Sequence, residues 1–362
     1  MPRGYMKLKT RELGTQCNAS TLQRGTIRML IVAIGEKGGT GCAEAASSKA
    51  QMKCFGSLRR TFGYAVPRSE VCKKSLMKYS TSKETSSGYC VNMVKNFDYE
   101  NFLCTLLLPN DIRTSAFAIR AFNIETARVQ DSVSDPRIGQ MRLKFWEETI
   151  DNIYNGHVPK QPVASELYRA IKRHTLSKRH LKRLILARSN HFSTSFLSLD
   201  EMESYAEEST SPVYYMLLEA LGIKNIHADH AASHLGKAQG LTNMVRSVPH
   251  CAERRLAPPL PQDVMMEKGV SQEEIIRGSR SDNTRDVIFT VAARASQHLE
   301  KARSIKTNLP EPAFRIFLPG VPVGQYLEKL RLLHFDVFDA KLQRRNSLLP
   351  LALYWNRFRM KF

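Results

Sequence analysis

The sequence predicts an all-α fold, with a single helical domain at residues 93–345 between a basic leader at 1–92 and a basic amphipathic tail at 346–362. Three observations indicate this organisation. From about residue 97 apolar residues recur at the three- and four-residue spacing of helix faces. No stretch shows the sustained two-residue alternation, bounded by hairpin turns, that is typical of strands. We find no internal repeat, so one helical domain is expected.

The leader is the most basic part of the chain. Lys and Arg outnumber Asp and Glu by 54 to 34, which gives a net charge of +20. Residues 1–90 hold 16 basic and 5 acidic side chains, a net +11, and the first aspartate of the chain is Asp98. This composition is typical of mitochondrial transit peptides. Within it, Met52, Phe55, Leu58 and Phe62 share one helical face. A disordered basic tail without a targeting role is the alternative.

Cysteine usage and hydropathy bound the class of protein further. The chain has seven cysteines, of which only Cys104 and Cys251 follow residue 90. No CxxC pattern occurs, so neither a disulfide framework nor a cysteine metal site is expected, and a reducing compartment such as the mitochondrial matrix is favoured. No apolar run reaches the 18 or so residues that a membrane-spanning helix needs. Any contact with a membrane would therefore be peripheral.

Two helices are expected at the start of the domain. In "DYENFLCTLLLP" the apolar residues follow the spacing of a buried stripe, and Pro109 closes the segment. The stripe consists of Tyr99, Phe102, Leu103, Leu106 and Leu107. The segment "DIRTSAFAIRAFNIETARVQDSV" then predicts a long helix, with Asp111 placed as its N-cap.

The following segments predict eight further helices by the same periodicity. Gly156 and Gly222 stand where helix stops belong. Residues 249–263, "PHCAERRLAPPLPQD", carry four prolines and predict an irregular loop. The expected helices lie at 138–156, 162–174, 177–189, 199–222, 228–247, 271–279, 282–304 and 323–333.

The segment "LTNMVRSVPHC" carries the pattern of a helix that faces a cavity, with Asn243 and Arg246 on its inner wall. Ser247 and Cys251 are four residues apart, at positions where paired carboxylates would suit such a wall. Pro249 lacks a backbone N–H, so it is expected to end the helix early.

The order of these segments resembles that of the squalene and phytoene synthases. The resemblance covers about residues 97–340 and rests on six stretches in sequence. They are "LLLPNDIRTSAFAIRAFN", "MRLKFWEETIDNIYNG", "YAEESTSPVYYMLLEALG", "LGKAQGLTNMVRSV", "LPQDVMMEKGVS" and "YLEKLRLLHFDVF". The resemblance implies a single all-α isoprenoid synthase domain. It also implies a chemistry in which magnesium ions bound by paired aspartates neutralise the charge of a departing diphosphate.

At the positions that match the two acidic segments, most carboxylates are missing. Ala127 and Arg128 stand where the leading aspartates belong in the first segment, and only Asp131 remains. In the second segment Ser247 and Cys251 replace the pair. We therefore expect a catalytically inactive protein with no catalytic residue, metal or cofactor. An active prenyl or terpenoid transferase that uses prenyl diphosphates with unorthodox metal binding is the alternative.

Four polar residues near this degenerate motif are candidates for contact with an anionic head group in the old cavity. They are Asn243, Arg246, Arg254 and Arg255. Arginine binds phosphate and carboxylate without a metal. The alternative is that these arginines face solvent or form surface ion pairs. His227, His230 and His234 share a helical face, and ordinary packing is favoured there over a metal site.

Four stretches carry a closer resemblance: "RAFNIETARVQDSVSDPRIGQMRLKFW", "GIKNIHADHAASHLGKAQG", "GVSQEE" and "NSLLPLALY". On these stretches the chain resembles most a degenerate branch of the family that serves the assembly of mitochondrial respiratory complex I. This implies a protein on the matrix side of the inner membrane, whose partners are complex I subunits or assembly intermediates. It also implies a role at an early stage, around a mitochondrially encoded membrane subunit. Nucleic-acid binding is not expected, because over half of the charge excess lies in the leader.

The tail at 346–362 joins aromatic and leucine residues to cations. Arg357, Arg359 and Lys361 accompany Trp355 and Phe358, a composition that suits the surface of an anionic membrane. A terminal helix packed on the body, with its charges in solvent, is the alternative, and the two do not exclude each other.

Overall fold

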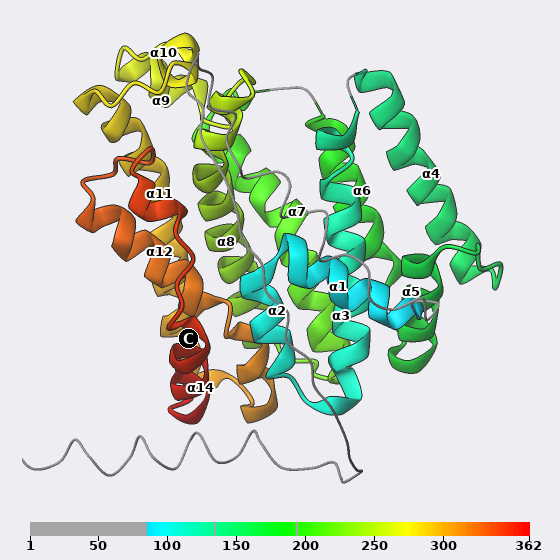
Figure 1. The fold of residues 1–362 in the computed structure, drawn as a ribbon. Helices are drawn as coiled ribbons and strands as arrows, with labels where there is room; N and C mark the ends of the chain where they lie inside the picture. The colour runs from blue at the N-terminus through cyan, green and yellow to red at the C-terminus, as the bar shows by residue number, and fades with distance from the viewer. Residues whose placement is uncertain (1–84, 134, 193–194) are drawn as a thin grey trace, which may run out of the picture. The chain divides into compact units, whose positions relative to one another are not determined.

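The computed structural model describes residues 85–133, 135–192 and 195–362, all of which lie within one compact unit. These residues form helices joined by short connections, and none of them is in a β-strand (Figure 1). The all-α prediction is confirmed. The expected import signal at residues 52–62 lies outside the described residues, as does most of the expected leader.

The sequence predicted that the helical domain starts at residue 93. Helix α1 (Ser86–Phe97) shows that it starts earlier. The Thr85 side chain accepts a hydrogen bond from the Gly88 N–H and caps the helix. Cys90, Met93 and Val94 are buried where α1 packs against α3 and α5. Their spacing is that of a helix face, so residues 86–92 belong to the core rather than to a leader.

Helix α2 (Tyr99–Leu106) buries a different face from the predicted one. Its buried residues are Asn101, Cys104 and Thr105, whereas Leu106 is exposed. The Thr105 hydroxyl donates to the Asn101 carbonyl, which satisfies a polar group inside the core. The predicted stripe is therefore wrong as a single buried face. Leu103 and Leu107 instead pack against the C-terminal helix.

Helix α3 (Asn110–Ala127) runs through the core and is buried along most of its length. Pro109 takes the N-cap position without a side-chain hydrogen bond, and Asp111 lies in the first turn. The prediction of Asp111 as the N-cap is therefore wrong. A carboxylate in the first turn still interacts favourably with the N-terminal end of the helix dipole. A short 3-10 helix, η2 (Gln130–Ser132), follows.

Most of the remaining helices lie close to the predicted segments, but the short helices at 262–267 and 340–343 were not predicted, and the first of them begins inside the loop expected at 249–263. Gly156 and Gly222 have positive φ angles of 88° and 69°, as expected of residues that end helices. The elements are α4 (Pro136–Tyr154), α5 (Pro162–His174), α6 (Lys178–Asn190), α7 (Leu199–Ala220), α8 (Ile226–Glu253), α9 (Gln262–Glu267), α10 (Gln272–Ile276), α11 (Asp282–Ser304), η3 (Lys306–Asn308), η4 (Glu311–Phe317), α12 (Gly320–Leu332), α13 (Ala340–Gln343) and α14 (Leu349–Phe358).

Helices α7 and α8 pack closely against each other, because glycines let their backbones approach. A Cβ atom built on Gly236 would lie 2.7 Å from the Ser211 Cα atom. One built on Gly240 would lie 2.8 Å from the Ala206 Cα atom. Helix α11 packs on another side of α8, and α4 and α6 lie beyond α7 (Figure 1).

Helix α8 continues through Pro249 to Glu253, so the prediction that proline ends it is wrong. Proline removes one backbone donor, but the last turns are completed by other bonds. The Arg254 N–H donates to the His250 carbonyl, and the Leu256 N–H donates to the Cys251 carbonyl. The extra turns carry Cys251 and Arg254 to the same end of the fold as η2, where Arg254 contacts Asp131.

The C-terminal helix α14 packs on the body rather than extending from it. Leu349 and Leu353 are buried in a small apolar cluster with Cys104, Leu318 and Val321. The predicted packing of a terminal helix on the body is confirmed. In the described part of the chain, no helix is both long enough and apolar enough to cross a bilayer.

Candidate functional site

The first segment of the degenerate motif lies where α3 ends. Ala127 is the last residue of α3 and Arg128 is its C-cap. The Arg128 guanidinium stacks on the ring of Phe97, with 3.6 Å between the guanidinium carbon and the ring centroid. The arginine is therefore held by a cation–π contact at a position where the resemblance implies a metal-binding aspartate.

The second segment lies on the last turns of α8. The Ser247 hydroxyl donates to the Met244 carbonyl at 2.8 Å. Burial raises the pKa of the Cys251 thiol, a hydrogen bond with Ser247 lowers it, and the nearby Asp131 carboxylate raises it. Cys251 therefore stays a neutral thiol at physiological pH and contributes no anion to the site.

An ion pair joins the two segments. The Asp131 carboxylate accepts from the Arg254 guanidinium at 3.1 Å, and a second guanidinium nitrogen lies 3.5 Å from the Asp131 carbonyl oxygen. The side chains are 57% and 40% exposed, so the pair adds little to stability. The pair matters for the charge of the site, because the Arg254 cation already faces Asp131, the one carboxylate of the motif.

Arg246, another candidate for ligand contact, is also occupied. It donates to both carboxylate oxygens of Glu100, at 2.6 and 3.2 Å, and stacks on the Tyr326 ring at 4.3 Å. A bidentate pair of this kind fixes the plane of the guanidinium. It ties α8 to α2 and α12.

The four candidate ligand residues are not gathered around a described cavity. Asn243 and Arg255 are exposed, and neither forms a hydrogen bond with Arg246 or Arg254. A cavity of about 510 Å³ lies between α12 and the C-terminal segment, and one of about 500 Å³ lies near the start of α8. Neither of these two cavities is lined by any of the four residues.

Magnesium is the metal that the resemblance implies, and the residues of the motif do not fit it. Magnesium prefers carboxylate oxygens, and several ions are needed to neutralise a diphosphate. The five motif positions supply one carboxylate, which Arg254 already neutralises, and one added cation in Arg128. In the ranges that the structure describes, no three His, Cys, Asp or Glu side chains group as a metal site would require.

The fold and the family profile both indicate the family to which this chain belongs. The family profile described as squalene/phytoene synthase matches residues 94–351. The chain belongs to the squalene/phytoene synthase family. Among solved structures, a dehydrosqualene synthase in complex with a ligand is similar with a TM-score of 0.64 and 19% identity, over 76% of this chain and 95% of that one.

Within the squalene/phytoene synthase family, this chain is similar to proteins named for another task. It is 46% identical over 275 residues to "NADH dehydrogenase (ubiquinone) complex I, assembly factor 6" of Bos taurus, which covers 76% of this chain and 82% of that protein. The homologue so named in Drosophila melanogaster is 42% identical over 281 residues, covering 76% and 84%.

The partners of the degenerate residues were not identified from the sequence. Phe97, Glu100 and Tyr326 hold Arg128 and Arg246. Glu100 and Arg246 are 146 residues apart in the chain, and no local pattern connects them. One buried polar residue could have been found from the sequence, because Arg120 interrupts the apolar run of α3. Arg120 is only 5% exposed and lowers the pKa of Asp98, which burial raises more strongly.

The histidines of α8 form a hydrogen-bonded row that continues onto neighbouring helices. His234 contacts His298 through its Nδ1 atom at 2.8 Å and His230 through its Nε2 atom at 3.1 Å. The Nε2 atom of His298 lies 3.2 Å from Glu203. Because His234 uses its two nitrogens in opposite directions, the three rings do not converge on one point. His227 lies at a separate cavity with His230.

Burial shifts the titration of this row. Burial, followed by the charges of His298 and His230, lowers the pKa of His234 to about 4. Burial alone would raise the pKa of Glu203, but hydrogen bonds from Lys237 and Arg294 and the nearby His298 imidazole lower it to about 2. At neutral pH the row therefore contains a neutral His234 and an ionised Glu203.

Proposed function

We propose that this protein acts in the early assembly of mitochondrial respiratory complex I, in the biogenesis of a mitochondrially encoded membrane subunit, and that it does not condense prenyl diphosphates. The observation that carries the proposal is the ion pair of Asp131 with Arg254 in a chain whose relatives at 42–46% identity are named complex I assembly factor 6. In this proposal the prenyl synthase fold serves to present an interaction surface.

The charges at the motif support the absence of synthase chemistry. A diphosphate leaves an allylic carbon only when its negative charge is neutralised, and the five motif positions supply a single carboxylate for the metal ions that would do so. Asp131 would first have to be released from Arg254 before it could bind a metal ion. Arg128 would repel a metal ion that approached the same corner.

The composition of the leader supports a place in mitochondria. Residues 1–90 carry a net +11 with the amphipathic pattern of an import signal, and we propose that the domain works on the matrix side of the inner membrane. Its partners there would be complex I subunits or assembly intermediates. An anionic head group at Arg246 or Arg254 would have to displace Glu100 or Asp131, so the proposal includes no small ligand.

The proposal is tested in cells that lack the protein. Blue-native electrophoresis should show less assembled complex I, and the wild-type chain should restore it. Asp131→Asn should restore it equally, because the proposal gives that carboxylate no chemical role. Unchanged complex I in the null cells would remove the assembly function.

A failure of Asp131→Asn alone would point to the alternative, an active prenyl transferase. Asp135→Asn is the matched control, because that aspartate caps α4 through a hydrogen bond to the Arg137 N–H near the same site. Equal protein levels of the two variants, checked by immunoblot, would separate a chemical defect from instability.

A further inference from the structure

The outward face of α14 exposes a continuous row of large apolar side chains. Leu351 is 61% exposed, Trp355 58% and Phe358 80%. Leu348 and Tyr354, at 64% and 67%, widen the row. Spacings of three and four residues place these side chains along one side of the helix, opposite the buried Leu349 and Leu353. Exposed apolar rows of this size mark interaction surfaces.

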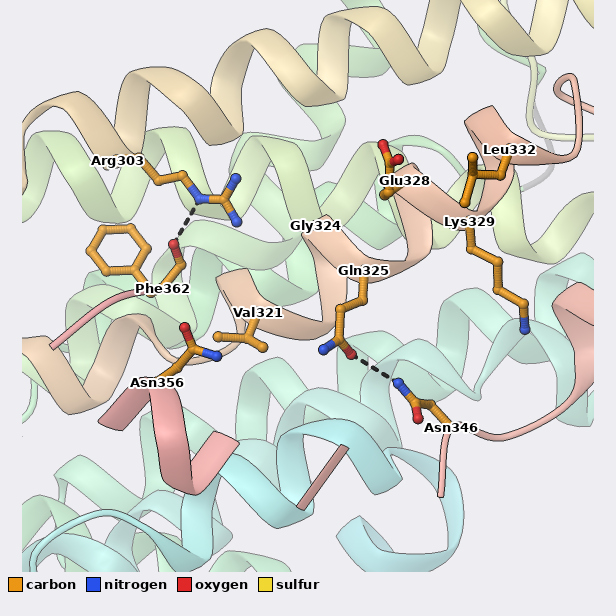
Figure 2. Close-up of a pocket in the computed structure, with 10 residues that line it drawn as sticks. All are labelled: Arg303, Val321, Gly324, Gln325, Glu328, Lys329, Leu332, Asn346, Asn356 and Phe362. Carbon is orange, nitrogen blue, oxygen red and sulfur yellow. Dashed lines mark hydrogen bonds between the residues drawn. The ribbon is translucent and has the colours of Figure 1, made fainter. Parts of the chain in front are cut away.

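The body holds this helix in place from both ends. At the far end, the Arg303 guanidinium donates to the main-chain oxygen of Phe362 at 2.7 Å, and the Phe362 ring packs on Phe314 and Phe317. At the near end, Asn346 donates to Gln325 at 3.0 Å. Figure 2 shows both contacts around the cavity between α12 and the C-terminal segment. The apolar row is therefore presented on a fixed helix.

The charged side chains of the C-terminal segment that carries the row all have one sign. Residues 344–362 contain five cations and no Asp or Glu. Arg359 stacks on the Trp355 ring at 5.4 Å, and Arg345 stacks on the Tyr99 ring at 5.1 Å. Arginine and aromatic side chains placed together in this way suit the headgroup layer of a membrane, where the rings are half in water and half in lipid.

We propose that this surface, formed by Leu348, Leu351, Tyr354, Trp355 and Phe358 with the surrounding arginines, docks the protein on an anionic lipid bilayer. The inference rests on the proposed location at a membrane and names the surface that makes the contact. Charge decides for a bilayer over a protein partner, because every ionised side chain of residues 344–362, the segment that carries the row, is a cation. The apolar side chains then enter the acyl region while the arginines bind lipid phosphates.

The test is flotation of the full chain with vesicles of equimolar phosphatidylcholine and phosphatidylglycerol. Leu351→Gln, Trp355→Gln and Phe358→Gln are combined in one variant, which should lose binding by at least about tenfold because three apolar side chains no longer enter the bilayer. The matched control combines Ile138→Gln, Met141→Gln and Phe145→Gln on α4. Those side chains are 48%, 71% and 57% exposed and also lie along one side of a helix.

The control variant should float like the wild type, and the basic leader is common to all three proteins. Equal binding by the α14 variant and the wild type, or an equal loss in the α4 control, would overturn the proposal. Circular dichroism and thermal unfolding should show the same fold in all three, since every substituted side chain is exposed.

A second measurement uses the unsubstituted chain. It has two tryptophans, of which Trp146 is 7% exposed and Trp355 is 58% exposed. Vesicles should shift the emission of Trp355 to the blue, and spin-labelled lipids should quench it. If vesicles bind the chain but the Trp355 emission neither shifts nor is quenched, then another part of the chain makes the contact.

The outcome is separable from that of the proposed function. Normal vesicle binding by the α14 variant, with failure to restore complex I in null cells, would assign the surface to a protein partner and overturn the lipid proposal. Loss of vesicle binding, with normal complex I in null cells, would keep the surface and remove the assembly function.

Discussion

Single side chains decide what the old catalytic corner of this molecule can do. Arg254 neutralises Asp131, Arg128 is stacked on Phe97, and the Cys251 thiol has a raised pKa through burial. The chain therefore presents cations and neutral groups where the resemblance implies a cluster of anions.

His234 gives the folded protein a measurable pH dependence. Its pKa is lowered to about 4 by burial and by the neighbouring His298 and His230, whereas an unfolded histidine titrates near 6.5. The folded state thus binds this proton at lower pH than the unfolded state does. Stability should fall as the pH drops through this window, by about 1–2 kcal/mol from about pH 7 to about pH 5.

Thermal unfolding of His234→Gln over the same pH range checks this expectation. The variant should lose part of the decline in melting temperature that the wild type shows. His227→Gln, on the same helix but exposed, is the control and should keep the full decline. Parallel curves for His234→Gln and the wild type would mean that the histidine row does not govern acid stability.

At the scale of elements, the close approach of α7 and α8 depends on glycine. A Cβ atom at Gly236 would lie 2.1 Å from the Ser211 Oγ atom and 2.7 Å from its Cα atom. Because the backbone of α7 cannot give way as a flexible side chain could, Gly236→Ala should destabilise the protein by about 1–3 kcal/mol. This loss should exceed the gain of up to about 1 kcal/mol from better helix propensity.

Chemical denaturation of Gly236→Ala and Asn243→Ala, both on α8, tests this packing. Asn243 is exposed, so its substitution should stay within about 0.5 kcal/mol of the wild type. If Gly236→Ala were as stable as Asn243→Ala, the two helices would have room that the structure does not show.

Element by element, the sequence predicted most helices but failed at the start of α1 and at the end of α8. Helix periodicity located α5 and α11 to the residue because their apolar faces end at clear caps. It missed the start of α1, since a short face of Cys90, Met93 and Val94 is easily lost in a basic stretch. It also ended α8 at Pro249, because local rules do not include the tertiary packing that carries a helix past a proline.

The candidate site was predicted in part. The matching positions 127, 128, 131, 247 and 251 could be read from the order of segments, and the structure brings Asp131 to Arg254 across the two segments. The partners could not be predicted, because Glu100 and Phe97 meet α8 and α3 only after the chain has folded. Pairs this distant in sequence leave no periodic signal.

At the scale of the whole molecule, we propose that the fold of a prenyl synthase is kept without its chemistry. The chain shares its fold with a dehydrosqualene synthase at 19% identity. Fold alone does not imply activity, because the reaction depends on charges at one corner. What the molecule keeps is a rigid helical body with an apolar, cationic face on α14.

The most direct test of this account is a measurement of pyrophosphate released by the purified protein with farnesyl or geranylgeranyl diphosphate and magnesium. A dehydrosqualene synthase assayed in parallel serves as the positive control. The account predicts no release above a blank without protein, since Asp131 is bound by Arg254 and the other motif positions carry no anion. Release above the blank that disappears in Asp131→Asn would contradict the account and establish an enzyme.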